Sequence, residues 1–163
     1  MRSVRSFPNF KFRISSFGLH ESPITAPTFY LYNPSGTPMI VGTGIDIAEV
    51  DRIAAAIRRH GDHFLQRLFT PAEIAYCEKH RDKFQRYAAR FAAKEAAMKA
   101  LGTGWRKGVR WLDIEVTRLP SGQPSLRLAG QARQFADALG VKNIALSITH
   151  SGNSALAQVI FES

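Results

Sequence analysis

The helical stretch 83–101 carries the residues best suited to chemistry. At about 100° per residue, Glu95 falls in the middle of an apolar stripe made by Phe84, Ala88, Phe91 and Met98. A carboxylate in such surroundings must be paired, protonated or bound to a metal, because burying it alone is costly. Lys99 lies one turn further along, within reach of whatever Glu95 holds. The simpler interpretation is a solvated Glu–Lys pair. Lys94 points elsewhere and is the weaker candidate.

A second carboxylate, Asp46, interrupts the apolar run 39–47, which predicts a buried strand. The period of two puts Asp46 and Gly44 on one face and Ile45 and Ile47 on the other. Glycines in a strand let a ligand or another backbone approach closely. Two carboxylates in apolar surroundings are a plausible Mg²⁺ site, because Mg²⁺ takes one or two protein carboxylates and completes its shell with water and substrate phosphates. The alternative is that Asp46 caps the helix that follows.

Further polar groups could meet a phosphate-bearing ligand. The loop Gly102-Thr103-Gly104 follows a helix, so it is neither a Walker loop nor a dinucleotide fingerprint. Ser147, Thr149 and His150 end a strand beside a turn, although a lone histidine there is usually a surface residue.

Two arginines, Arg52 and Arg59, project from the polar face of the first helix. They form either a solvated face or a docking surface for an acidic partner. The only cysteine, Cys77, lies in a helical stretch, which favours a structural role and fits a reducing compartment.

The elements that must position these residues begin at Met39. The pattern predicts an order of strand, helix, helix, long helix, two strands, helix and a final hairpin. Thr70, Pro71 and Glu73 form a capping box at the start of the second helix. Leu112, Ile114 and Val116 alternate along one predicted strand. We therefore expect an α+β fold with a mostly antiparallel sheet packed against the long central helix.

Residues 1–38 differ from the rest of the chain. They contain four basic residues, one acid and five prolines, and no periodicity persists. This composition predicts a poorly ordered extension, either a transit peptide or the product of a translation start placed too early. The domain proper is then 39–163.

The net charge of +9 suits an acidic or polyphosphate partner. The sequence has no basic run with interleaved aromatic residues, so the pattern does not favour nucleic-acid binding. It also has no apolar run long enough to cross a membrane.

Five motifs occur in the order and spacing of one family: Gly44-Ile45-Asp46-Ile47, Arg90-Phe91-Ala92-Ala93-Lys94-Glu95-Ala96 with Lys99-Ala100, Gly102-Thr103-Gly104, Gly122-Gln123-Pro124 and Ser147-Ile148-Thr149-His150. The chain from Met39 to Ser163 resembles the holo-acyl-carrier-protein synthases, which are the short 4′-phosphopantetheinyl transferases. The family usually has lysine where this chain has Gln123, which puts a charge-based role of that position in doubt. The extension before Met39 has no counterpart in the family pattern.

The resemblance implies a cytoplasmic enzyme of fatty acid biosynthesis and lipid metabolism. Such an enzyme transfers 4′-phosphopantetheine from coenzyme A to a serine of an acyl carrier protein and releases adenosine 3′,5′-bisphosphate. It further implies that Asp46 and Glu95 bind Mg²⁺, that Glu95 and Lys99 are catalytic, and that a homotrimer places the active site between subunits. The remaining implied contacts are Lys99, Gly102, Thr103, Ser147 and His150 around coenzyme A, and Arg52 and Arg59 at the carrier protein.

Two other classes compete with this interpretation. A magnesium-dependent phosphohydrolase would use the same two carboxylates and pass the group to water. A basic nucleic-acid-binding module would need only the net charge, and its binding would depend strongly on salt.

Overall fold

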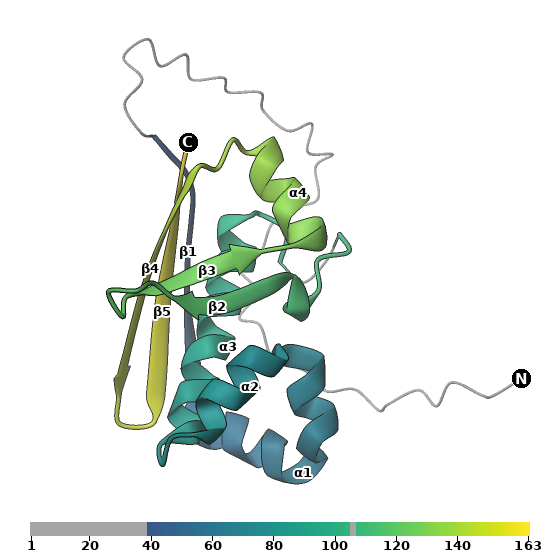
Figure 1. Cartoon of the computed structure of the whole chain (residues 1–163), viewed down its shortest axis with the longest axis vertical. Coiled ribbons are helices and arrows are strands. Elements are labelled where there is room, and N and C mark those ends of the chain that lie inside the picture. The colour runs from purple at the N-terminus through teal and green to yellow at the C-terminus, as the bar shows by residue number, and fades with distance from the viewer. Residues whose placement is uncertain (1–38, 105–106) are drawn as a thin grey trace, which may run out of the picture. The chain divides into compact units, whose positions relative to one another are not determined.

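The computed structural model describes residues 39–104 and 107–163, and the predicted extension 1–38 lies outside the described residues. The elements, in chain order, are β1 (Ile40–Glu49), α1 (Val50–Leu68), α2 (Pro71–Glu78), α3 (Lys83–Ala100), the 3₁₀ turn η1 (Trp111–Asp113), β2 (Ile114–Arg118), β3 (Pro124–Leu128), α4 (Gly130–Ala138), β4 (Asn143–Ser151) and β5 (Ser154–Glu162). Figure 1 shows them in this order, from blue at β1 to yellow at β5.

The strands form two antiparallel sheets in place of the one sheet expected. The larger has the order β1-β5-β4, and the smaller is the hairpin β2-β3. In the larger sheet Asp46 pairs with Ala157, which in turn pairs with Ile148. Helix α3 packs against β1 and β5 of this sheet and also contacts β2 (Figure 1). The predicted α+β fold around a long central helix is confirmed.

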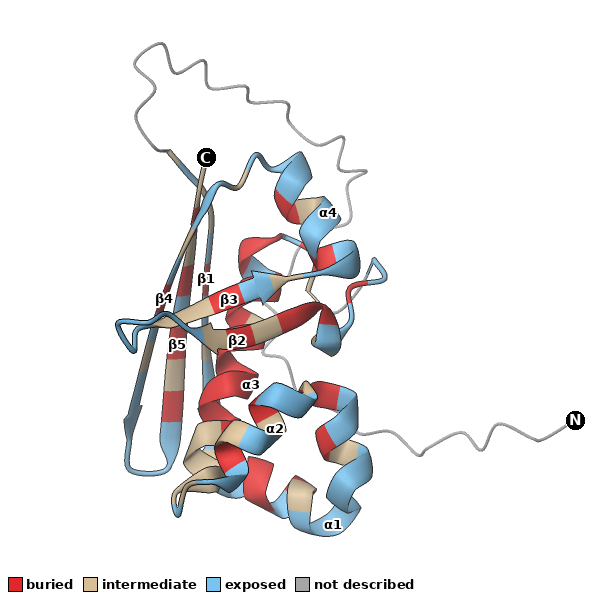
Figure 2. Cartoon of the chain, viewed as in Figure 1, coloured by how far each residue is buried: buried red, intermediate tan, exposed pale blue. Residues whose placement is uncertain are grey.

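Helix α3 is buried on nearly all sides (Figure 2). From 87 to 100 every residue is buried except Glu95 and Lys99. A helix that is apolar all round belongs in the core, and the many alanines of α3 let its neighbours come close. On one side of α3 the Phe91 ring stacks on the Trp111 ring, with the ring centroids 4.9 Å apart. Helix α3 therefore lies at the centre of the core and also carries Glu95 and Lys99, the two residues of 87–100 that are not buried.

The approach of α3 to β1 depends on two glycines. A Cβ atom on Gly44 would overlap the carbonyl oxygen of Ala96 and lie 2.8 Å from the Ala100 nitrogen, and one on Gly42 would overlap the Ala100 carbonyl. The sequence left open whether these glycines admit a ligand or another backbone. The structure shows that they admit the backbone of α3.

The helix starts agree with the local sequence signals. The Thr70 hydroxyl accepts a hydrogen bond from the Glu73 amide, and the Glu73 carboxylate accepts one from the Thr70 amide, which confirms the capping box. Gly61, at φ 53°, breaks α1 as expected. The first turn of α1 is capped by Asn153, whose oxygens accept from the amides of Val50 and Asp51. The alternative role of Asp46 as a helix cap is therefore wrong.

Two expectations fail for physical reasons. Leu112 belongs to η1 and is 41% exposed, so the strand starts only at Ile114. The strand β1 is not buried on both faces, because Ile45 and Ile47 are 53% and 60% exposed. They belong to a face, which we call the open face, that points away from α3. In strand register its members are Thr43, Ile45, Ile47, Ala145, Ser147, Thr149, Leu156, Gln158 and Ile160.

Candidate active site

Asp46, Glu95 and Lys99 meet where α3 passes the outer strand β1. Asp46 projects from β1 towards α3 and is half-buried. The Lys99 Nζ donates to Asp46 Oδ1 and to the carbonyl of Ile45, each at 2.8 Å. Strand β1 is at the edge of its sheet, so some of its backbone groups have no partner strand. The Lys99 ammonium group gives one of them, the carbonyl of Ile45, a hydrogen bond. The structure thus brings together the three residues on which the sequence argument depended.

The electrostatics of Glu95 mark it as unusual. Burial, together with the nearby charge of Asp46 and against the opposing charge of Lys99, raises the pKa of Glu95 to about 7. Burial also raises the pKa of Asp46, against the hydrogen bond and charge of Lys99. Two carboxylates that hinder each other's ionisation are typical of a functional site. Glu95 itself is half-buried, while Ala88, Phe91 and Met98 of the predicted apolar stripe are buried.

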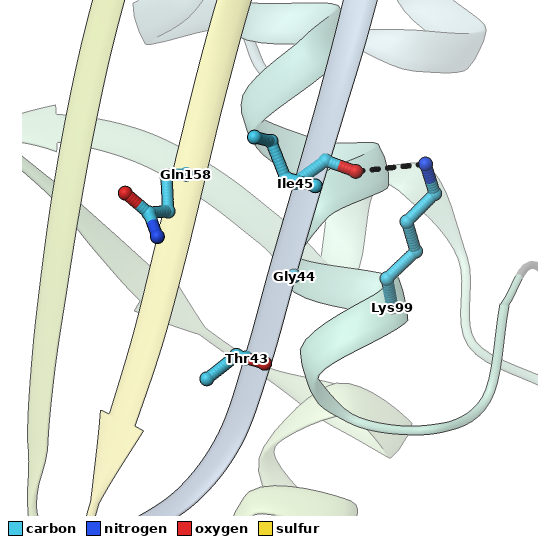
Figure 3. A pocket seen from close by; sticks show the side chains of 5 residues that line it. All are labelled: Thr43, Gly44, Ile45, Lys99 and Gln158. Atoms are coloured by element: carbon cyan, nitrogen blue, oxygen red, sulfur yellow. Dashed lines mark hydrogen bonds between the residues drawn. The ribbon is translucent and has the colours of Figure 1, made fainter.

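A hollow of about 380 Å³ adjoins this group. It is lined by Thr43, Gly44, Ile45, Lys99 and Gln158. Figure 3 shows Lys99 reaching the Ile45 carbonyl on one side of β1, with Thr43 and Gln158 on the other side. The hollow therefore extends from Lys99 to the open face, of which Thr43, Ile45 and Gln158 are members.

The loop after α3 is stabilised by the hydrogen bonds of one of its own side chains, Thr103. Gly102, at φ 68°, closes the helix and is exposed. Thr103 is buried, and its hydroxyl bonds the carbonyl oxygens of Gly104 at 2.9 Å and Met98 at 3.4 Å. In this arrangement the Thr103 side chain stabilises the loop and does not face outward.

Ser147 and His150 do not join the group within one chain. Both lie on β4, which is separated from β1 by β5, so the strands are roughly 10 Å apart. Ser147 belongs to the open face, and His150 pairs with Ala155 near the hairpin turn. Both side chains are exposed. A single chain accordingly presents its predicted ligand contacts on separate surfaces.

The remaining candidates are distributed as follows. Arg52 and Arg59 are exposed on α1. Cys77 is fully buried, and burial raises the pKa of its thiol to about 11, so it belongs to the core as expected. Lys94 is also fully buried and pairs with Glu73 of α2 at 2.7 Å. Sequence reasoning missed this pair, because no local pattern joins a residue of α2 to one of α3.

The donor set suits a hard cation with few protein ligands. Among the described residues no three His, Cys, Asp or Glu side chains cluster, which disfavours a zinc-type site. The Asp46 and Glu95 carboxylates match the one or two that Mg²⁺ uses beside substrate phosphates. The ammonium group of Lys99 already lies against Asp46, so this position accepts positive charge.

Comparison with known proteins decides the family. A family model described as the 4′-phosphopantetheinyl transferase superfamily matches residues 42–158. This chain belongs to that superfamily. Within the transferase superfamily it is 63% identical over 124 residues to the holo-[acyl-carrier-protein] synthase of Solibacter usitatus (strain Ellin6076), which covers 76% of this chain and 99% of that protein. The predicted family is confirmed.

Solved transferase structures have the same fold. The holo-[acyl-carrier-protein] synthase from Neisseria meningitidis superposes with a TM-score of 0.70 at 31% identity, covering 77% of this chain and all of that one. The enzyme from Bacillus anthracis str. Ames, solved in complex with CoA (3′,5′-ADP), has a TM-score of 0.63 at 39% identity and covers 77% and 98%. In the described part of this transferase, no helix is long and apolar enough to span a membrane.

Proposed function

We propose that this chain transfers the 4′-phosphopantetheine arm of coenzyme A to a serine hydroxyl of an apo acyl carrier protein. The observation that carries the proposal is the meeting of Asp46, Glu95 and Lys99 beside a hollow, on a chain that belongs to the phosphopantetheinyl transferases. The serine oxygen forms a bond to the phosphorus that carries pantetheine. The bond from that phosphorus to the bridging oxygen breaks, and adenosine 3′,5′-bisphosphate leaves.

In this proposal Asp46 and Glu95 hold Mg²⁺. When bound, Mg²⁺ would neutralise the charge of the coenzyme A diphosphate. Their raised pKa values support the role, because each carboxylate lacks a sufficient counter-charge in the metal-free chain. The site would receive that charge together with the ligand.

The chain supplies positioning and charge, which dominate phosphoryl-type displacement. Lys99 is 48% exposed in its side chain and can turn its Nζ from Asp46 to the leaving phosphate. Glu95, the carboxylate beside Asp46 and Lys99, is the candidate base for the serine proton. The acceptor serine belongs to the carrier protein, so the enzyme needs no nucleophile of its own.

Further contacts complete the proposal. Gly102, Thr103, Ser147 and His150 would surround coenzyme A, with Thr103 acting through the loop backbone. Arg52 and Arg59 would meet an acidic surface of the carrier protein, where exposed charges increase the association rate. The single, buried Cys77 fits work in a reducing compartment such as the cytoplasm, within fatty acid biosynthesis and lipid metabolism.

We further propose that the chain acts as a homotrimer. Its open face exposes Ile45 and Ile47, and in the described chain nothing covers these side chains. An apolar sheet face of this kind marks an association surface. Association through it would bring a second copy's strand β4, with Ser147 on the open face, towards the hollow beside Lys99. The number of three rests on the family resemblance.

The oligomer can be tested on the open face. Light scattering of the wild-type protein is expected to give three times the chain mass. Ile47→Asp should give a smaller species, because three buried carboxylates would have to be desolvated. Leu112→Asp is the matched control, since Leu112 is also exposed but lies away from the open face. A wild-type monomer at concentrations where the enzyme is active would contradict the trimer.

The metal site predicts a particular dependence on pH. The folded pKa of Glu95 is raised from 4.5 to about 7, so the uncharged site stabilises the fold below pH 4.5 and this contribution is lost as the pH rises through 7. Mg²⁺ needs both carboxylates ionised. It should therefore raise the melting temperature by a few degrees at pH 8 and not at pH 5. An equal shift at both pH values would contradict a site built on Glu95.

Coenzyme A turnover separates the proposal from a phosphohydrolase. A transferase consumes coenzyme A and releases adenosine 3′,5′-bisphosphate only when an apo carrier protein is present. Chromatographic assay with and without apo carrier protein measures this directly. Consumption at the same rate without carrier protein would favour the hydrolase, which would use the same carboxylates.

A further inference from the structure

A fully buried ion pair includes Lys94, the residue that precedes Glu95 in α3. Lys94 Nζ is 2.7 Å from Glu73 Oε2, and both side chains are completely buried. The same Nζ donates to the carbonyl oxygens of Ile114 at 2.6 Å and Trp111 at 3.0 Å. A lysine ammonium group has three donors, and all three are satisfied here.

The pair connects four parts of the fold. Glu73 Oε2 also accepts from the Thr70 amide at 2.8 Å, and Oε1 accepts from the Val116 amide at 3.0 Å. Helices α2 and α3, the turn η1 and strand β2 therefore meet at one pair of charges. Buried ion pairs add little net stability compared with apolar groups of the same volume. The consequence of this arrangement is thus a defined geometry more than a gain in stability.

The geometry concerns Glu95, because it follows Lys94 in α3. On its sheet side α3 is set by contact with Gly42 and Gly44. On the other side Lys94 joins α3 to Glu73 of α2 and to the carbonyl oxygens of Trp111 and Ile114. A carboxylate roughly 6 Å from the helix axis moves about 1 Å for each 10° of rotation. A shift of that size in a catalytic group can reduce a rate about 100-fold.

We propose that Glu73 and Lys94 are positioning residues that fix the rotation of α3, so that Glu95 faces Asp46 at the distance needed to share a divalent cation. The inference rests on the proposed metal site. It assigns to the buried pair a role in the reaction that differs from the docking or charge-neutralising roles of the surface cations.

The test uses Mn²⁺ as a spectroscopic probe of the site. Mn²⁺ affinity is measured by electron paramagnetic resonance for the full-length wild type, for Lys94→Met and for the double variant Glu73→Gln/Lys94→Met. The double variant removes both buried charges, so it leaves no bare charge and is expected to fold. Lys83→Met is the matched control, because Lys83 also pairs a residue of α3 with α2, through Glu78 at 2.9 Å, but is exposed and far from Glu95 in sequence.

Positioning predicts that the double variant keeps the native circular dichroism spectrum and loses at least tenfold in Mn²⁺ affinity and in kcat. The KM for the carrier protein and the Lys83→Met values should change less than twofold. A folded double variant with wild-type affinity and kcat would overturn the positioning role and leave the metal site standing. A wild type that binds no Mn²⁺ would overturn the metal site itself and, with it, the role of the pair.

Discussion

Glu95→Gln is expected to lower kcat by roughly 100-fold or more, the scale seen when one preorganised charge is removed from an active site. Glutamine keeps the volume of the side chain but cannot accept a proton or supply a full negative charge to a cation. The assay is the initial rate of carrier-protein modification at saturating coenzyme A, with the KM for the carrier protein measured in parallel.

This variant should not lose stability. The folded pKa of Glu95 lies above 4.5, so its ionised form opposes folding at pH 8, and the neutral amide removes its repulsion with Asp46. The melting temperature at pH 8 should therefore equal or exceed that of the metal-free wild type. Glu49→Gln, the same change on an exposed side chain at the end of β1, is the control and should leave the rate unchanged. A fully active Glu95→Gln variant would refute the catalytic and metal-binding roles of Glu95.

Gly44→Ala is expected to destabilise the domain by about 3 kcal/mol, at the upper end of the usual effect of overpacking a core. The new methyl group would overlap the backbone of α3 at Ala96, and a backbone cannot turn aside as a flexible side chain can. The helix would have to move away from β1 along the contact that also places Glu95 opposite Asp46. Urea unfolding gives the change in free energy, and Mg²⁺-dependent stabilisation should be lost in the same variant.

The neighbouring position supplies the comparison for Gly44→Ala. Thr43 is exposed on the opposite face of β1, so Thr43→Ala should change the free energy of unfolding by less than about 0.5 kcal/mol. If Gly44→Ala were as stable as Thr43→Ala, the close approach of α3 to β1 would be wrong, and the positioning argument built on it would fail.

Much of the site could be predicted from the sequence because it depends on local periodicity. Glu95 and Lys99 are one helical turn apart, and the alternation of β1 put Asp46 on the face of Gly44. These rules also anticipated the capping box at Thr70 and the break at Gly61. What they could not give was the partner of each face. Ile45 and Ile47 read as a buried strand because their apolar composition is that of a core, and it does not show that the rest of the chain leaves this face exposed.

The buried pair of Glu73 and Lys94 shows the same limit of prediction from sequence, here for two charged residues. Glu73 was predicted as part of a capping box, which is a local arrangement of four residues. Its second role, as the counter-charge of Lys94, joins positions 21 residues apart through the packing of α2 on α3. No periodicity within either helix contains that information. Only the tertiary arrangement shows that the lysine beside Glu95 is completely buried.

The most direct test of the central claim is the intact mass of an apo acyl carrier protein after incubation with this enzyme, coenzyme A and Mg²⁺. We predict a mass gain equal to one phosphopantetheine group on the carrier protein, and no gain when EDTA removes the metal. An unchanged mass for every apo carrier protein tested, with the enzyme folded and Mg²⁺ present, would contradict the proposed function.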